Sequence, residues 1–296
     1  MLDHAAYATR LTAQAAPRLP IDRLCVGREV NEVRALVPRI FNLCRDAQAA
    51  ALDAALGRNV EPEAATQEVL RDHLIKFFVT WPGMLGLSAG RLPMGWTTTP
   101  AVLADAVFGP SRRPPHSAAA FDAFLASEVG VAPVLRRIAD AFGPGEAVAD
   151  GLGLATRASV WAEAPIENSV ATRHADHPVM AHIEAEWGRG PLWRAVARAY
   201  DIDAALAGAL PPIVAPEAGR AVATAARGAY ALCVKVADGR VRAFTRMTPT
   251  DHLLANGGVL DRSLATLPSA KIALGPLVLD ILDPCSPVRL REVGHA

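Results

Sequence analysis

Two of the four cysteines stand where a thiol could do chemistry. Cys44 comes just after Asn42, at the expected start of a helix, and Cys285 stands in the stretch Asp283-Pro284-Cys285-Ser286-Pro287. Backbone N–H groups in the first turn of a helix lower the pKa of a thiol, because they stabilise the thiolate. The prolines keep the chain around Cys285 out of a helix and hold its thiol beside a carboxylate. Both residues are candidate metal ligands, although a lone cysteine is more often a small buried hydrophobic residue.

The spacing of the cysteines excludes several classes of protein. The other two are Cys25 and Cys233, and no two of the four form a Cys-x-x-Cys pair. Zinc fingers, thioredoxin-like redox motifs and iron–sulfur proteins need denser patterns, and so does a secreted disulfide framework. We therefore expect Cys25 and Cys233 to be core or surface thiols without a chemical role.

Two further stretches could bind a ligand. In Ala226-Arg227-Gly228, arginine beside glycine could present a guanidinium and a backbone N–H to one small anion; the alternative is an exposed arginine before a strand. His174 and His177 have the spacing of two metal ligands on one helix. Pro178 directly follows His177 and disfavours a regular helix through both, and no third ligand is evident. We expect no metal at these histidines.

These residues must be positioned mainly by helices. Alanine, leucine, arginine and glutamate recur with the helical period. Two short alternating stretches flank Asp238-Gly239 and predict a β-hairpin over 229–236 and 240–246. Residues 83–118 are broken by glycine and proline, and 109–116 is expected to be a surface loop. The predicted helices cover 12–37 (one or two helices, closed by Pro38), 42–56 (capped by Asn42), 62–80 (stopped by Trp81-Pro82-Gly83), 119–128, 131–142, 176–187 and 190–209. We predict a single domain over residues 1–296, mainly α with a small antiparallel β element (α+β).

Composition and charge restrict the partners. The 296 residues are 51% hydrophobic and 20% charged, which suits a sizeable core. Thirty basic and 30 acidic residues balance, so a broad basic surface for nucleic acid or anionic lipid is not expected. No targeting signal is evident, and no apolar run reaches the roughly 18 residues of a membrane span. We expect a cytoplasmic protein that binds neither nucleic acid nor membrane.

Taken in order, these landmarks resemble the large subunit of nickel–iron hydrogenases over about residues 20–291. The family motif Arg-x-Cys-Gly-x-Cys-x-x-x-His is represented here by Arg39 and Cys44, and Asp-Pro-Cys-x-x-Cys-x-x-His by Asp283, Pro284 and Cys285. The remaining cysteines and histidines of the two motifs are replaced by Phe41, Gln48, Val288 and Arg291.

Other landmarks lie between the two motifs. Arg227 matches the arginine of the family's Pro-Arg-Gly, the hairpin follows it, and Thr248-Pro249-Thr250 follows the hairpin. Asp72-His73-Leu74, with Phe77 and Phe78, matches a helical segment, and residues 167–173 match a Gly-Pro-Arg stretch. Because the chain is short, it looks closest to the HupK/HoxV-type accessory proteins of hydrogenase assembly. The resemblance implies a shortened large-subunit-like fold.

The resemblance also implies a ligand set. In the family, four cysteines hold nickel, and two of them bridge to an iron that carries two cyanides and one carbon monoxide. Cys44 then falls on a bridging ligand and Cys285 on a terminal nickel ligand. Two thiolates would hold nickel poorly, but they suit a low-spin iron with strong-field diatomic ligands. This Fe(CN)2(CO) unit on two thiolates is a dianion that needs donors, and the resemblance assigns that role to Arg227 and Thr250, next to Pro249.

Three functions follow for comparison. The first is a non-catalytic assembly scaffold that transiently holds the Fe(CN)2(CO) unit between Cys44 and Cys285 and passes it to the apo large subunit. The second is a metal-free interaction protein that mimics the large subunit to bind HypC-type maturation chaperones. The third is an enzyme, which is disfavoured because no histidine stands beside either cysteine to form a nucleophilic pair. The scaffold requires both thiols to reach one shared pocket.

Overall fold

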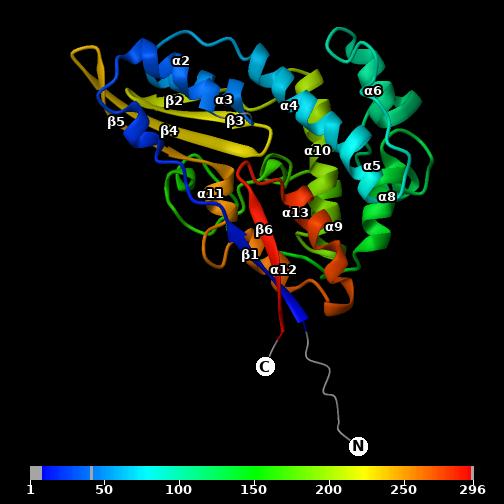
Figure 1. Cartoon of the computed structure of the whole chain (residues 1–296). Coiled ribbons are helices and arrows are strands. Elements are labelled where there is room, and N and C mark those ends of the chain that lie inside the picture. The colour runs from blue at the N-terminus through cyan, green and yellow to red at the C-terminus, as the bar shows by residue number, and fades with distance from the viewer. Residues whose placement is uncertain (1–8, 41–42, 295–296) are drawn as a thin grey trace, which may run out of the picture.

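The computed structural model describes residues 9–40 and 43–294, which form an α+β fold with a helical part beside a four-stranded sheet (Figure 1). The strands are β1 (Thr9–Ala15), β2 (Val214–Glu217), β3 (Arg220–Ala225), β4 (Gly228–Ala237), β5 (Arg240–Met247) and β6 (Val288–Gly294). The α-helices are α1 (Ile21–Cys25), α2 (Val30–Ile40), α3 (Arg45–Ala55), α4 (Glu63–Ile75), α5 (Trp81–Met84), α6 (Pro100–Phe108), α7 (Ala118–Leu125), α8 (Ala132–Ala141), α9 (Pro178–Trp187), α10 (Pro191–Leu206), α11 (Pro249–Leu253), α12 (Val259–Ala265) and α13 (Gly275–Leu282). No helix in these ranges is both long and apolar enough to cross a membrane.

The four-stranded sheet is antiparallel, in the order β2-β3-β4-β5. The hairpin of β4 and β5 turns at Asp238 and Gly239, which both have positive φ (53° and 69°), as the tightest hairpin turns require. This confirms the predicted hairpin. Helices α2 and α3 pack along one face of the sheet and enclose a small core that includes Leu52, Tyr230 and Phe244 (Figure 1).

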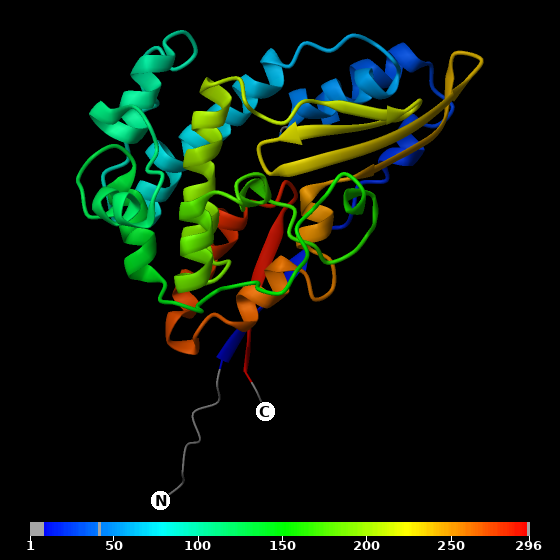
Figure 2. The same cartoon turned by 180° about the vertical axis from the view of Figure 1, so that it is seen from behind.

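The helical part is built around α10, which runs through its centre (Figure 2). Almost every residue of α10 is buried, because α4, α8, α9 and α13 pack around it. Alanines on several sides of α10 let these neighbours approach closely. Charged side chains on such a helix must find partners inside the protein, since burying an unpaired charge is costly.

A separate two-stranded ribbon joins the two ends of the described chain. Strand β1 pairs antiparallel with β6, so that Ala15 lies opposite Val288 and Thr12 opposite Arg291. One face packs closely on the start of α13, where a Cβ added at Gly275 would lie 2.3 Å from Leu11. Strand β6 of the ribbon follows directly on the Cys285 segment, and in Figure 1 the ribbon lies beside α13 and in front of α12.

Several predicted element boundaries are wrong. The residues from Thr12 to Ala15 form a strand and not a helix, because they pair with a strand near the other end of the chain. Pro38 lies inside α2 and does not end it. Helix α6 lies in the stretch predicted to be irregular.

Two further boundaries concern the site. Helix α4 passes through a π-helical turn at Lys76–Thr80 and continues as α5, with Pro82 in the first turn of α5, so Trp81-Pro82-Gly83 does not stop the helical path. Helix α3 begins at Arg45, and its predicted cap Asn42 lies outside the described residues.

Candidate functional site

Cys44 is the N-cap of α3, with a left-handed φ of 53°, and it is only 6% exposed. The N–H groups of Asp46 and Ala47 at the start of this helix donate to the carboxylate of Glu68, each over 3.2 Å. The positive end of the helix is therefore already neutralised by an anion. Burial dominates and raises the pKa of the Cys44 thiol to about 12, although the charge of Arg227 opposes this. The prediction that the helix start lowers the pKa of Cys44 is wrong.

Arg227 is the residue that the thiol contacts. It lies in the tight turn between β3 and β4, and its Nη1 donates to Cys44 Sγ (3.2 Å) and to the carboxylate of Asp72 (3.0 Å). It is 7% exposed, which excludes the alternative of an exposed arginine before a strand. Gly228 fixes the turn, because its φ is +141° and an added Cβ would lie 2.5 Å from the backbone oxygen of Asn168.

Cys285 is held by Thr250. The Cys285 N–H donates to Thr250 Oγ1 (2.8 Å), and Thr250 Oγ1 lies 2.9 Å from Cys285 Sγ, with its own proton free to be donated to sulfur. The hydroxyl is positioned by α11, whose start is set by a capping box between Thr248 and Asp251 and by Pro249 in its first turn. Cys285 itself is half-buried.

Asp283 connects the surroundings of Cys44 with those of Cys285. It caps the end of α13, two residues before Cys285, and its backbone oxygen accepts from Arg227 Nε (3.1 Å). One guanidinium thus binds Cys44 and the Asp-Pro-Cys segment at once. These contacts form one cluster, in which Arg227 joins Cys44 to Asp283 and Thr250 holds Cys285.

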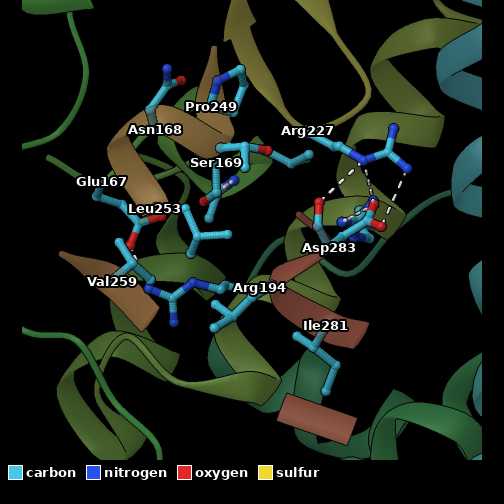
Figure 3. A pocket seen from close by; sticks show the side chains of 15 residues that line it. Glu167, Asn168, Ser169, Arg194, Arg227, Pro249, Leu253, Val259, Ile281 and Asp283 are labelled. Atoms are coloured by element: carbon cyan, nitrogen blue, oxygen red, sulfur yellow. Dashed lines mark hydrogen bonds and ion pairs between the residues drawn. The ribbon is translucent and has the colours of Figure 1, made fainter. Parts of the chain in front are cut away.

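A small cavity adjoins this cluster (Figure 3). Arg227, Pro249, Thr250 and Asp283 belong to its wall, and its volume of about 20 Å³ has room for about one water molecule. In Figure 3, Glu167 and Arg194 form a buried ion pair on the side away from Arg227 and Asp283. Apolar side chains complete the wall, among them Leu253, Val259 and Ile281. The cavity thus offers charged donors beside hydrocarbon.

A buried chain of hydrogen bonds supports Asp283 from behind. Arg198 donates to the Asp283 carboxylate (3.1 Å) and to Nδ1 of His73 (3.0 Å), and His73 Nε2 lies 2.8 Å from Asp201. Because an arginine is always protonated, Nδ1 of His73 must accept, and the ring is neutral with its proton on Nε2. Burial lowers the pKa of His73 to about 4, against the pull of Asp201.

The two carboxylates in this chain stay ionised. Burial alone would raise the pKa of Asp283, but Arg198, Arg227 and Lys76 together hold it well below its usual range. The same holds for Asp201, where Arg173 is the main cation. Sequence analysis missed this support. The one sign of this hydrogen-bond chain in the sequence is the presence of Arg194, Arg198 and Asp201 in a helix that is otherwise largely apolar.

The remaining candidates lie apart from the two thiols. His174 Nε2 contacts Asp201 (3.0 Å), whereas His177 Nε2 contacts His116 Nδ1 (3.2 Å), so the two histidines have different partners. Among residues 9–40 and 43–294, no three His, Cys, Asp or Glu side chains are grouped in a way that could hold a metal ion. Cys25 is buried in the core of the sheet and Cys233 is half-buried on β4. Phe41 lies outside the described residues, and Val288 opens β6.

Comparison with curated proteins places this α+β chain in the class of hydrogenase expression/formation proteins. It is 45% identical over 278 residues to "Hydrogenase expression/formation protein HupK" of Rhodobacter capsulatus, covering 94% of this chain and 92% of that protein. It is 28% identical over 311 residues to "Hydrogenase expression/formation protein HupV" of Azotobacter chroococcum mcd 1, covering 91% and 90%. No family model matches the chain. At this identity and coverage, the chain belongs to the HupK family of hydrogenase expression/formation proteins.

Proposed function

We propose that this chain is a non-catalytic scaffold in nickel–iron hydrogenase maturation, with a shortened large-subunit-like fold. It transiently holds the Fe(CN)2(CO) unit between Cys44 and Cys285 and then passes it to the apo large subunit. The observation that carries the proposal is the position of Arg227, which binds Cys44 Sγ and Asp283 together. The names of the two relatives support a role in hydrogenase formation.

The charges around the thiols suit an anionic cargo. Iron bound by two cyanides and two thiolates is a dianion, and a buried anion needs charged or hydrogen-bonding partners. Burial acts to lower the pKa of Arg227, but the carboxylates of Asp283 and Asp72 help to raise it above its ordinary value, so the guanidinium stays charged. The hydroxyl of Thr250, which donates to Cys285 Sγ in this structure, supplies a second donor beside that thiol.

The state of Cys44 suits a carrier that must release its cargo. With a pKa of about 12, the thiol keeps its proton at neutral pH until a metal displaces it. Rebinding of that proton competes with iron. Two thiolates and a competing proton make a weaker hold than four thiolates, as transfer to another protein requires.

Infrared spectroscopy tests the proposal. The protein purified from a hydrogenase-competent host should show bands of metal-bound cyanide and carbon monoxide. Cys44→Ala and Cys285→Ala should lose these bands, whereas the matched control Cys233→Ala, on β4, should keep them. A wild-type protein without such bands from that host would contradict the scaffold.

One observation favours the metal-free alternative. Cys44 Sγ is already hydrogen-bonded within the protein, so the site is satisfied without a cargo. In this alternative the chain imitates the large subunit and binds a HypC-type maturation chaperone. Capture of that chaperone by the Cys44→Ala/Cys285→Ala double variant as well as by the wild type, with no iron in either sample, would support it over the scaffold.

A further inference from the structure

The two faces of the β1–β6 ribbon differ in chemistry. Side chains alternate between the faces of a strand, and directly paired residues share a face. Leu11, Ala13, Val288 and Leu290 share the face that packs on the helical core. By the same register, the opposite face carries Arg10, Thr12, Gln14, Arg289, Arg291 and Val293.

Three arginines dominate this outward face. Arg289 and Arg291 stand two residues apart on β6, a separation of roughly 7 Å. Arg10 lies opposite Val293 and is the diagonal neighbour of Arg291, again at about 7–8 Å. All three side chains are exposed. Like charges held this close on a rigid ribbon repel one another, and an anion between them would remove that cost.

No carboxylate of this chain supplies that anion within 9–40 and 43–294. Some exposed arginines elsewhere are paired, as Arg18 is with Glu163 (2.8 Å) and Arg240 with Glu29 (3.2 Å), whereas others, such as Arg91 and Arg137, stand singly on the surface. Arg10, Arg289 and Arg291 form no ion pair and no side-chain hydrogen bond with the described residues. The three side chains, here called the arginine strip, thus have no ionic partner in the part of the chain that the structure describes.

The spacing of the strip fits an extended acidic polypeptide. Every second side chain of an extended strand lies about 7 Å from the last. Carboxylates at every second position of an acidic partner segment would therefore meet successive guanidinium groups of the strip. Val293, 40% exposed, adds an apolar contact on the same face. A net charge of zero over the whole chain sets this local strip apart from the broad basic surface that a nucleic acid or an anionic membrane needs.

The strip also lies next to the thiol site along the chain, because β6 begins at Val288, three residues after Cys285. We propose that the outward face of the β1–β6 ribbon docks an extended acidic segment of the protein that exchanges the iron unit with this chain. The identity of that protein rests on the proposed function. The docking itself needs no metal, since the strip is complete in the chain alone.

Charge reversal with a matched control tests the docking. The full-length, metal-free protein is compared as wild type, as Arg289→Glu/Arg291→Glu, and as Arg91→Glu/Arg137→Glu, which changes the charge equally at exposed arginines outside the ribbon. Binding is measured by fluorescence anisotropy with a labelled peptide of alternating glutamate and threonine. It is also measured with the purified HypC-type chaperone and the apo large subunit of the host. Circular dichroism verifies folding.

We expect the ribbon variant to bind the peptide and one of the two proteins at least tenfold more weakly, with the control unchanged. Equal weakening in both variants, or no change in either, would overturn the proposal. The proposal would also be overturned if the wild type and the control bound duplex DNA or phosphatidylglycerol vesicles, the ribbon variant did not, and protein binding were the same in all three. Infrared bands report the iron cargo separately, so docking without bands contradicts only the scaffold, and bands without docking contradict only the strip.

Discussion

Arg227 Nη1 donates a hydrogen bond to Cys44 Sγ over 3.2 Å, although the two residues are 183 positions apart in the chain. The same guanidinium contacts Asp72 and Asp283, so it joins the start of α3, the helix α4 and the end of α13. A buried cation with two buried carboxylates is stable only when all partners are present. Arg227 therefore serves both the structure of the site and its chemistry.

Removal of Arg227 should destabilise the fold strongly. Arg227→Met removes a buried cation that pairs with both Asp72 and Asp283. We therefore expect the free energy of unfolding to fall by about 3–5 kcal/mol. Arg227→Lys keeps the charge but loses the fork of donors, so its loss should be smaller. Urea unfolding at pH 7 measures both. A methionine variant as stable as the wild type would show that the pairing contributes nothing.

A side chain at Gly228 should displace the turn that carries Arg227. The Cβ of Gly228→Ala would lie 2.5 Å from the Asn168 oxygen, at a φ of +141°. Gly239 in the hairpin turn is a matched control, because its φ is +69° and nothing lies within 4 Å of an added Cβ. We expect Gly239→Ala to cost about 1 kcal/mol from backbone strain alone and Gly228→Ala clearly more. Equal melting temperatures for the two variants would argue against a tight turn at Arg227.

Loss of the Thr250 hydroxyl should loosen Cys285. Thr250→Val keeps the shape of the side chain but removes the acceptor of the Cys285 N–H, at a cost of about 1–3 kcal/mol for an unpaired buried donor. Thr250→Ser should restore most of this loss. Hydrogen exchange of the Cys285 amide gives a local measurement, and we expect faster exchange in the valine variant only. Unchanged exchange would mean that the hydroxyl does not hold this segment.

Acid should destabilise the protein through His73. Its pKa is about 4 in the folded protein and about 6.5 in an unfolded chain, so between these values only the unfolded chain takes up the proton. Stability is therefore complete above about pH 6.5 and falls as the pH drops towards 4, by at most about 3 kcal/mol from this residue. Below about pH 3.9 the depressed pKa values of Asp201 and Asp283 continue the loss in the same direction.

The variant His73→Gln isolates this contribution. Glutamine keeps a donor and an acceptor but does not titrate. His177 and His252, whose pKa values are also lowered, remain in both proteins and cancel in the comparison. Urea unfolding at pH 7, 5.5 and 4.5 should give a shallower fall for His73→Gln than for the wild type. Parallel curves would contradict a buried, neutral His73.

The sequence predicts well wherever neighbours along the chain decide the structure. The β4–β5 hairpin follows from Asp238-Gly239, and helices α7 to α10 are close to their predicted ranges, since turn residues and helical periodicity act locally. The sequence-based prediction failed for β1, because the partner of Thr12 is Arg291, near the other end of the chain. It also failed for the pKa of Cys44, because burial and Glu68 outweigh the helix start.

By itself, then, the sequence determined the α+β character, the hairpin and the set of site candidates, through residue types and short motifs that need no distant contact. Only the tertiary structure decided that Cys44 and the Cys285 segment meet at Arg227, that His73 and Asp201 stand behind Asp283, and that three arginines share one face of the ribbon. The reason is physical: burial, charge pairing and strand register depend on which distant segments pack together, and no local pattern specifies that.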